Sequence, residues 1–336
     1  MKHLLPAVGL ALVASLPVLA DVKINDNLTV SGYVAGAYTS FSPSPGVSSD
    51  SLFDAAKAPP GAGDANAIDL TFTATFKPVT AVVSLFEFPS SAGNAVGLNV
   101  LDAYVVYDAG DGLTITGGKF LSYLGYESFY PTLMSQISYA NGDFLGAIPA
   151  YHTGVKFDYT SGNTGLGMAL LDSIYSPYGY NRGDGEFRHN AGFEAYLQQK
   201  VGDLTLWGGV AYDTRGQAAL NQLNKVITLD FWTSYQINKA TAVAAEYQHK
   251  DGGLGAKGHN WLGFFSYNFT DKFSTVLRVS GEKMDSGGPG FTKYTVGPAY
   301  AVTDHLTVRA EYSYYDYTNY SSKKAHFFGV QGIFKF

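Results

Sequence analysis

The feature that most constrains this chain is an alternation of apolar and polar residues that recurs along most of its length. One clear segment reads AIDLTFTATFK, in which Ile68, Leu70 and Phe72 alternate with Asp69 and Thr71. Successive side chains of an extended strand point to opposite faces, so this segment has one apolar face and one polar face. A tilted transmembrane strand needs about 9–11 residues, and this segment is long enough.

Sixteen segments follow the same pattern, and short turns alternate with longer connections between them. An even number of strands with this alternation of turn lengths is typical of outer-membrane barrels. The sequence therefore predicts an all-β fold, a transmembrane antiparallel up-and-down β-barrel. A merged or split hairpin near residues 80–120 would make the count 14 or 18 instead of 16. The expected strands lie near residues 28–40, 67–77, 80–88, 99–108, 113–120, 150–160, 165–174, 189–200, 203–213, 225–237, 240–249, 258–269, 273–284, 291–301, 305–316 and 325–336.

Composition narrows the alternatives. Charged residues make up 15% of the chain, against about 25% in typical soluble proteins. A secreted β-sandwich or propeller is the soluble alternative, but its outer faces would need more Lys and Glu than these segments carry. The net charge of −6 is spread thinly, so no nucleic-acid partner is expected. The chain has no cysteine, so disulfides do not hold it together.

The N-terminal 20 residues have the pattern of a secretory signal peptide. Lys2 precedes an apolar stretch, and Val18 and Ala20 form a small-residue cleavage site. A single membrane anchor is the alternative, but the stretch is short for a span and contains two prolines. We therefore expect export, a mature barrel of residues 21–336, and a location in the outer membrane of a Gram-negative-type bacterium.

The chain ends on KKAHFFGVQGIFKF, an alternation that continues to the last residue. Phe328, Val330, Phe334 and Phe336 share one face, which we expect to meet outer-membrane lipid while the strand closes on residues 28–40. An open edge would leave backbone groups unpaired in hydrocarbon. Phe334 and Phe336 also fit an assembly signal for the barrel-assembly machinery.

Two stretches carry a resemblance to a known family. GGKFLSYLGYESF (117–129) and YANGDFLGAIPAYHTGVKFDY (139–159) resemble the OmpL-like β-barrel porins. The resemblance implies an outer-membrane pore without catalytic residues, and a homotrimer is one assembly it allows. The acidic P-E-F-G signature of general porins is absent between residues 121 and 149. The matching residues are Gly118, Lys119, Phe120, Gly125, Glu127, Pro149, His152, Thr153 and Gly154.

A sixteen-strand barrel is wide enough for an aqueous channel. We expect the long loop 121–149 to fold into the lumen and narrow it, although a loop that caps the barrel outside is the alternative. Trp207 and Trp232 suggest a stacking track for sugars, with packing as the plainer interpretation. The loop residues expected to line the narrowing are Glu127, Ser135, Gln136, Asn141 and Asp143.

Charged residues on the polar faces of the strands are the second set of pore-lining candidates. Acids outnumber bases in this set by seven to three, which predicts a weak cation preference. Salt-bridged scaffold residues with little net effect are the alternative. The set comprises Asp102, Lys156, Asp158, Glu194, Asp230, Glu246, Arg278, Glu282, Arg309 and Glu311.

The predicted function is passive diffusion of small hydrophilic solutes or ions through an outer-membrane porin. No cofactor and no metal site are expected. A barrel without an open pore, serving adhesion or envelope structure, is one alternative. A barrel enzyme acting on lipid is another, but the histidines after residue 20 are scattered and no G-x-S-x-G element appears.

Overall fold

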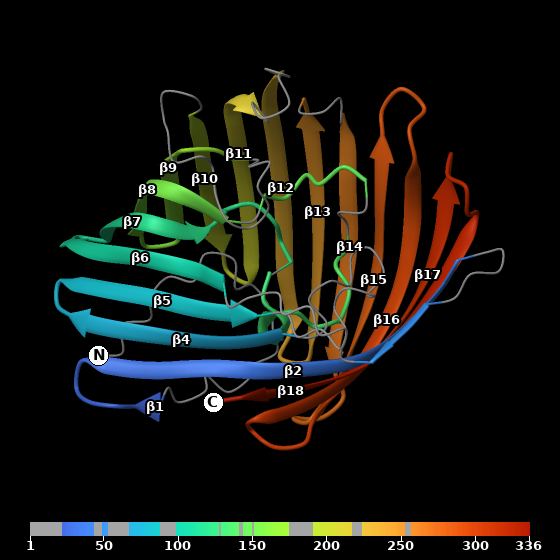
Figure 1. Ribbon diagram of the computed structural model, residues 1–336, viewed down its shortest axis with the longest axis horizontal. Coiled ribbons are helices and arrows are strands. Elements are labelled where there is room, and N and C mark those ends of the chain that lie inside the picture. The colour runs from blue at the N-terminus through green and yellow to red at the C-terminus, as the bar shows by residue number, and fades with distance from the viewer. Residues whose placement is uncertain are drawn as a thin grey trace.

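The computed structural model describes residues 22–43, 49–52, 67–87, 99–127, 129–140, 144–149, 151–174, 191–216, 224–252 and 257–336. Within these residues, sixteen antiparallel strands form one closed barrel, because β18 pairs with β2 as well as with β17 (Figure 1). The predicted signal peptide, residues 1–20, lies outside the described residues.

The wall strands are β2 (Leu28–Pro43), β4 (Ala67–Phe76), β5 (Val79–Glu87), β6 (Asn99–Gly110), β7 (Leu113–Leu121), β8 (Tyr151–Ser161), β9 (Thr164–Leu171), β10 (Gly192–Val201), β11 (Leu204–Gly216), β12 (Asn224–Asn238), β13 (Thr241–Asp251), β14 (Gly258–Asn268), β15 (Phe273–Met284), β16 (Gly290–Ala301), β17 (Leu306–Thr318) and β18 (Lys324–Lys335). Two short strands, β1 (Val22–Lys23) and β3 (Ser49–Leu52), pair with β2, and one 3-10 turn, η2 (Pro131–Leu133), lies between β7 and β8.

The predicted fold class and strand count are confirmed. Each of the sixteen expected segments coincides with one wall strand, and its limits differ from the observed ones by at most three residues. Short turns such as residues 111–112 and 202–203 join strands at one end of the barrel. Strand ends are the least certain part of any such prediction, because the alternation stops constraining the chain where pairing stops. No helix in the described ranges is long and apolar enough to cross a membrane.

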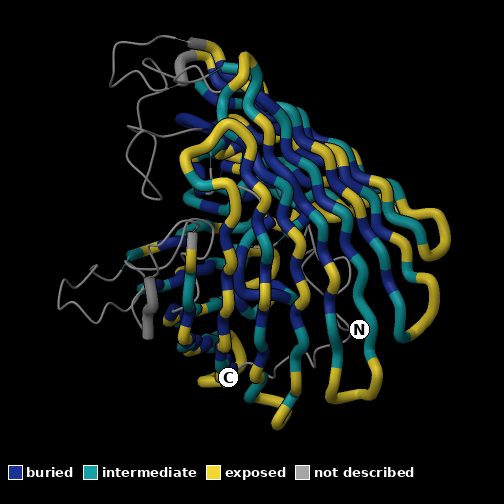
Figure 2. Tube along the Cα trace, turned by 90° about the vertical axis from the view of Figure 1, so that its right-hand side faces the viewer, coloured by how far each residue is buried: buried dark blue, intermediate teal, exposed yellow. Residues whose placement is uncertain are grey.

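The two faces of the wall differ as the alternation predicts. On β18, Phe328, Val330 and Phe334 are 45%, 38% and 48% exposed on the outer face, whereas the inner Gln331 is fully buried. On β17 the inner Arg309 is buried, in agreement with its predicted inward orientation. Along the wall strands, bands of buried and exposed residues alternate (Figure 2). The outer surface is therefore apolar, as a lipid-facing surface requires.

Closure extends to the end of the last strand. The backbone N–H of Gly32 donates to the carbonyl of Phe336 at 2.9 Å, and the N–H of Phe336 donates to the carbonyl of Gly32 at 3.0 Å. Each unpaired backbone group in hydrocarbon would cost several kcal/mol. Pairing the final residue therefore removes the sheet edge that a membrane could not solvate.

Exposed aromatic side chains gather where the strands meet the short turns. Phe76, Phe269, Phe273, Tyr300 and Phe334 all lie at this end with exposed rings. Aromatic rings favour the boundary between hydrocarbon and water, and girdles of this kind mark both edges of the apolar band in outer-membrane barrels. The short-turn end thus has one of the two expected girdles.

Val330→Arg tests which face meets lipid. Val330 lies near the middle of β18 on the outer face. We expect Arg there to lower the free energy of unfolding in lipid vesicles by about 2–4 kcal/mol, measured by denaturant titration with tryptophan fluorescence. Thr73→Arg, on the inner face of β4, is the matched control and should change stability by much less. Equal losses from the two variants would contradict the assignment of faces.

Candidate functional site

The segment between β7 and β8 lies inside the barrel, against the inner face of the wall (Figure 1). Its described residues after β7, 122–127, 129–140 and 144–149, form only one 3-10 turn and no strand. An irregular backbone of this kind cannot satisfy its own N–H and C=O groups, and buried groups must find partners. In this barrel many of the partners are charged side chains of the wall.

The first part of the loop is held by three carboxylates, on β10, β12 and β13. Each accepts a hydrogen bond from a backbone N–H of the loop, so the loop follows the wall from β10 to β13. The contacts are Tyr123 N–H to Glu194 (3.1 Å), Gly125 N–H to Asp230 (2.7 Å) and Tyr126 N–H to Glu246 (2.6 Å). These contacts give partners to three backbone donors that an irregular loop could not pair in a sheet or helix.

The second part of the loop is held in the same way on the other side. Glu311 on β17 accepts from the backbone N–H groups of Ile137 (2.6 Å) and Ser138 (2.8 Å), and also from the Ser138 hydroxyl. Glu282 on β15 accepts from the N–H groups of Phe144 (2.6 Å) and Leu145. Five wall carboxylates thus anchor two separate stretches of the loop.

Cationic wall residues bind the loop carbonyls that the carboxylates cannot. Each is buried and donates to at least one backbone oxygen of the loop. Wall carboxylates therefore pair with loop N–H groups, and wall cations pair with loop carbonyls. The contacts are Arg309 to Met134 O (2.6 Å), Arg278 to Ser138 O (2.9 Å), Lys293 to Tyr139 O (2.9 Å), and Lys250 to Leu145 O (3.1 Å) and Gly146 O (2.9 Å).

Glu127, one of the two acidic residues predicted in the loop, joins the loop to itself and to the wall. It forms a buried ion pair with Arg278 on β15. It also accepts from the backbone N–H of Ala140 (2.6 Å) and from the side-chain amide of Gln136 (2.6 Å). Breaking a buried pair by removing one partner leaves an uncompensated charge, so Glu127 fixes the shape of this part of the loop.

The middle of the loop reaches β6 and β8. The Tyr130 hydroxyl donates to Asp102 on β6 and contacts the hydroxyl of Tyr151 on β8. Burial raises the pKa of Tyr130 well above its usual value, so this hydroxyl stays protonated and continues to donate. Phe129 packs against Tyr151 and Phe86, with ring centroids 5.4 Å and 6.2 Å apart.

Trp207 and Trp232 are stacked on each other, and both rings are buried. Their ring centroids are 5.6 Å apart with an interplanar angle of 8°, and Tyr196 extends the stack at 5.9 Å from Trp207. Tyr126 of the loop packs on Trp232, and all four rings are buried. In this arrangement the stack is a packing surface for the loop, which favours the plainer of the two interpretations.

All ten wall residues named from the sequence lie on the inner side of the barrel. Eight contact the loop backbone or Tyr130, as described above, and Arg309 is one of them. Lys156 pairs with Asp158 at 3.8 Å and lies over the rings of Phe120 and Tyr123, each at 5.0 Å. Whether these residues border a conducting path stays a prediction.

The loop candidates are distributed differently. Glu127 and Gln136 are nearly or fully buried in loop contacts, and Ser135 borders a pocket described below. Asn141 and Asp143 lie outside the described residues.

Sequence reasoning missed Lys250 and Lys293, which bind loop carbonyls, and the inward Asp69 and Asp213. The alternation contained the signal: Lys250 is four residues beyond Glu246 on the same strand face. Among the described residues, no group of three or more His, Asp or Glu side chains is placed to hold a metal ion.

A closed sixteen-strand barrel with an apolar exterior and a polar, charged interior defines the porin class of outer-membrane channels. The comparison with protein families agrees. Residues 27–336 match the family described as "Putative beta-barrel porin-2, OmpL-like", and the chain belongs to it. The resemblance inferred from residues 117–159 is therefore confirmed, and the protein is an outer-membrane channel of this family.

Solved structures share the fold at low sequence identity. An anion-selective porin from Comamonas acidovorans is 12% identical, with a TM-score of 0.69, covering 92% of this chain and 99% of that one. OmpF of Salmonella typhi in complex with daunomycin is 11% identical, with a TM-score of 0.70 and coverages of 94% and 100%. OmpT of Vibrio cholerae in its trimer form is 13% identical, with a TM-score of 0.59 and coverages of 93% and 100%. A comparison with curated proteins found no match.

Two substitutions test the carboxylate anchors separately. Glu311→Ala removes the acceptor of the Ile137 and Ser138 N–H groups, and we expect hydrogen exchange at these two amides to accelerate about tenfold or more. Glu194→Ala should instead accelerate exchange at Tyr123 and leave Ile137 and Ser138 protected. Hydrogen exchange of the refolded protein in detergent measures both. If neither variant changes exchange at its own amides, the anchoring contacts described here are wrong.

Proposed function

We propose that the channel allows passive diffusion of small hydrophilic solutes or ions across the outer membrane, with the loop 121–149 as its narrowest part. The supporting observation is the set of buried carboxylate and cation contacts that hold this loop inside a closed barrel. Diffusion needs no cofactor and no coupled energy. The described parts of the loop are anchored to the wall at several points, which supports a role for the loop in setting the size limit.

We also propose a weak cation preference. It rests on the excess of acids over bases among the inner-wall residues. Acids still outnumber bases when the inward Asp69 and Asp213 are added together with Lys250, Lys293 and Lys335. Many of these charges are engaged by the loop, so only their summed field acts on a passing ion. A small preference follows from that field rather than a strong one.

Single-channel recording in a planar bilayer tests both parts of this proposal. We expect discrete conductance steps from refolded protein. Under a KCl gradient, the sign of the reversal potential should indicate a preference for cations. Asp102→Asn, which removes one inner carboxylate, should move the reversal potential toward zero. Protein that inserts fully folded but never conducts would refute the open channel and leave adhesion or envelope structure as the function. A reversal potential of the opposite sign would refute the cation preference alone.

The enzyme alternative has one constellation to consider. His152 lies 3.0 Å from Glu194, and the Ser122 hydroxyl donates to the same carboxylate at 2.6 Å. A nucleophilic serine needs its hydroxyl bonded to the base, but here the hydroxyl bonds to the acid. His152 and Glu194 are also buried beneath the loop, away from lipid. These contacts support a structural role, and we propose that the barrel is not an enzyme.

Assembly and export complete the proposal. The trimer form of Vibrio cholerae OmpT supports a homotrimer for this chain too. Residues 1–20 serve as the signal peptide, and Phe334 and Phe336 serve as the signal read by the barrel-assembly machinery. The exposed ring of Phe334 on the outer face, with its centroid 6.4 Å from that of Phe336, supports the last point.

A further inference from the structure

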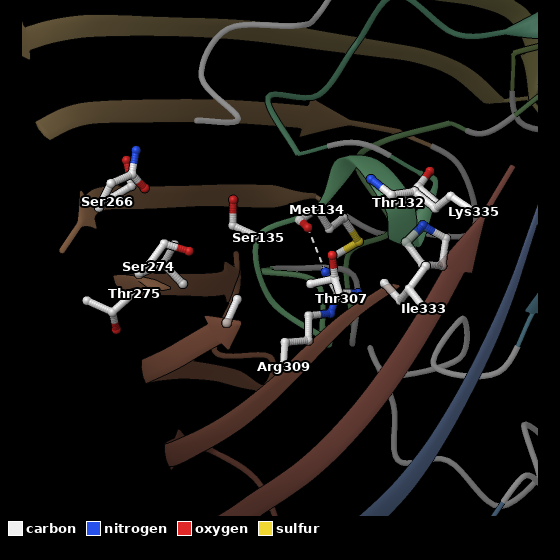
Figure 3. Close-up of a pocket in the computed structure, with 14 residues that line it drawn as sticks. Thr132, Met134, Ser135, Ser266, Ser274, Thr275, Thr307, Arg309, Ile333 and Lys335 are labelled. Carbon is white, nitrogen blue, oxygen red and sulfur yellow. Dashed lines mark hydrogen bonds between the residues drawn. The ribbon is translucent and has the colours of Figure 1, made fainter. Parts of the chain in front are cut away.

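A pocket opens inside the barrel on the short-turn side of the loop. Residues of η2 and its flank form one side, and the short-turn ends of β14 to β18 form the other (Figure 3). The wall contributes mainly small polar side chains, including Ser266, Asn268, Ser274, Thr275 and Thr307. This lining provides hydroxyl and amide groups beside apolar side chains such as Val276 and Ile333.

The charged groups of the pocket have one sign. Arg309 on β17 and Lys335 on β18 border it, and no acidic residue among those the structure describes does. The neighbouring acid on the same face of β17 is Glu311, whose oxygens accept from Ile137, Ser138 and Ser313. These contacts turn the Glu311 carboxylate toward the loop. The pocket therefore has a local positive potential within a wall that has more acids than bases.

Both cations have donor capacity that the described protein does not use. Arg309 is 3% exposed; its Nε donates to Gln331 at 2.6 Å and its Nη1 to Met134 O at 2.6 Å, but the buried Nη2 has no acceptor. The ammonium of Lys335, a residue 7% exposed, makes no hydrogen bond in the described part of the chain. A buried donor without an acceptor is costly, and an anion would remove that cost.

We propose that this pocket binds a small oxyanion, a carboxylate or a phosphate group. An oxyanion would accept from Nη2 of Arg309 and from the ammonium of Lys335. Carboxylate and phosphate oxygens suit a guanidinium because the planar N–H groups match their spacing. The hydroxyls of Thr307 and Ser135 border the same space and supply weaker, uncharged donors. The site faces the short-turn mouth, so a bound anion would sit at that entrance of the barrel.

Equilibrium binding tests the site without requiring conduction. The probe is inorganic phosphate, followed by ³¹P NMR line broadening against refolded protein in a neutral detergent at constant ionic strength. Lys335→Gln removes one of the two charges without touching a loop contact, and we expect about tenfold weaker binding. Lys272→Gln is the matched control, since Lys272 is an exposed lysine in a short turn at the same end, and it should bind as the unaltered protein does.

A second variant and a competitor make the outcomes decisive. Arg309→Lys keeps the charge and removes the planar donors, so it should also weaken phosphate binding in protein whose circular dichroism is unchanged. Succinate should displace phosphate if carboxylates use the same donors, and the tighter of the two ligands identifies the class bound. Phosphate binding that is absent, or that is equal in Lys335→Gln and Lys272→Gln, would overturn the proposal. Neither result bears on whether the channel conducts.

Discussion

The structure depends on the hydrogen bonds between wall carboxylates and the backbone N–H groups of the loop 121–149. A loop without regular secondary structure enters the barrel with backbone donors and acceptors that it cannot all pair by itself, and the wall supplies partners for many of them. Glu194, Asp230, Glu246, Glu282 and Glu311 accept from the N–H groups, and cationic side chains donate to the carbonyls. The position of the loop is therefore encoded on strands far from it in the sequence.

This role changes the meaning of the inner charges. An acid that accepts a backbone N–H is engaged by the loop, so it acts on a passing ion through its field and not as a free ligand. Arg278 illustrates the point, since it pairs with Glu127 and also donates to the carbonyl of Ser138. The same matching explains why the pocket beside Arg309 and Lys335 differs from its surroundings: there the loop leaves cationic donors unused.

The sequence alone predicted the barrel well because the alternation is local information. The two-residue period of the alternation determines both the positions of the strands and the inward orientation of Arg309. Neither requires knowledge of a partner segment. The loop contacts are different, since Glu311 and Ile137 are 174 residues apart and nothing in either segment specifies the other. Tyr151 shows a further limit: its place in the alternation would put it outside, but at the start of β8 it turns inward to meet Tyr130.

A designed disulfide tests the central claim that the loop is held against the inner wall. A Cβ added at Gly297 on β16 would lie 3.6 Å from the Cβ of Gln136, within the range that disulfides need, and the chain has no cysteine of its own. The measurement is the fraction of Gln136→Cys/Gly297→Cys protein that cross-links on mild oxidation, read by mass spectrometry. Near-complete cross-linking, with none in Gln136→Cys/Gly332→Cys, is the predicted result. Two free thiols in folded Gln136→Cys/Gly297→Cys protein would contradict the account.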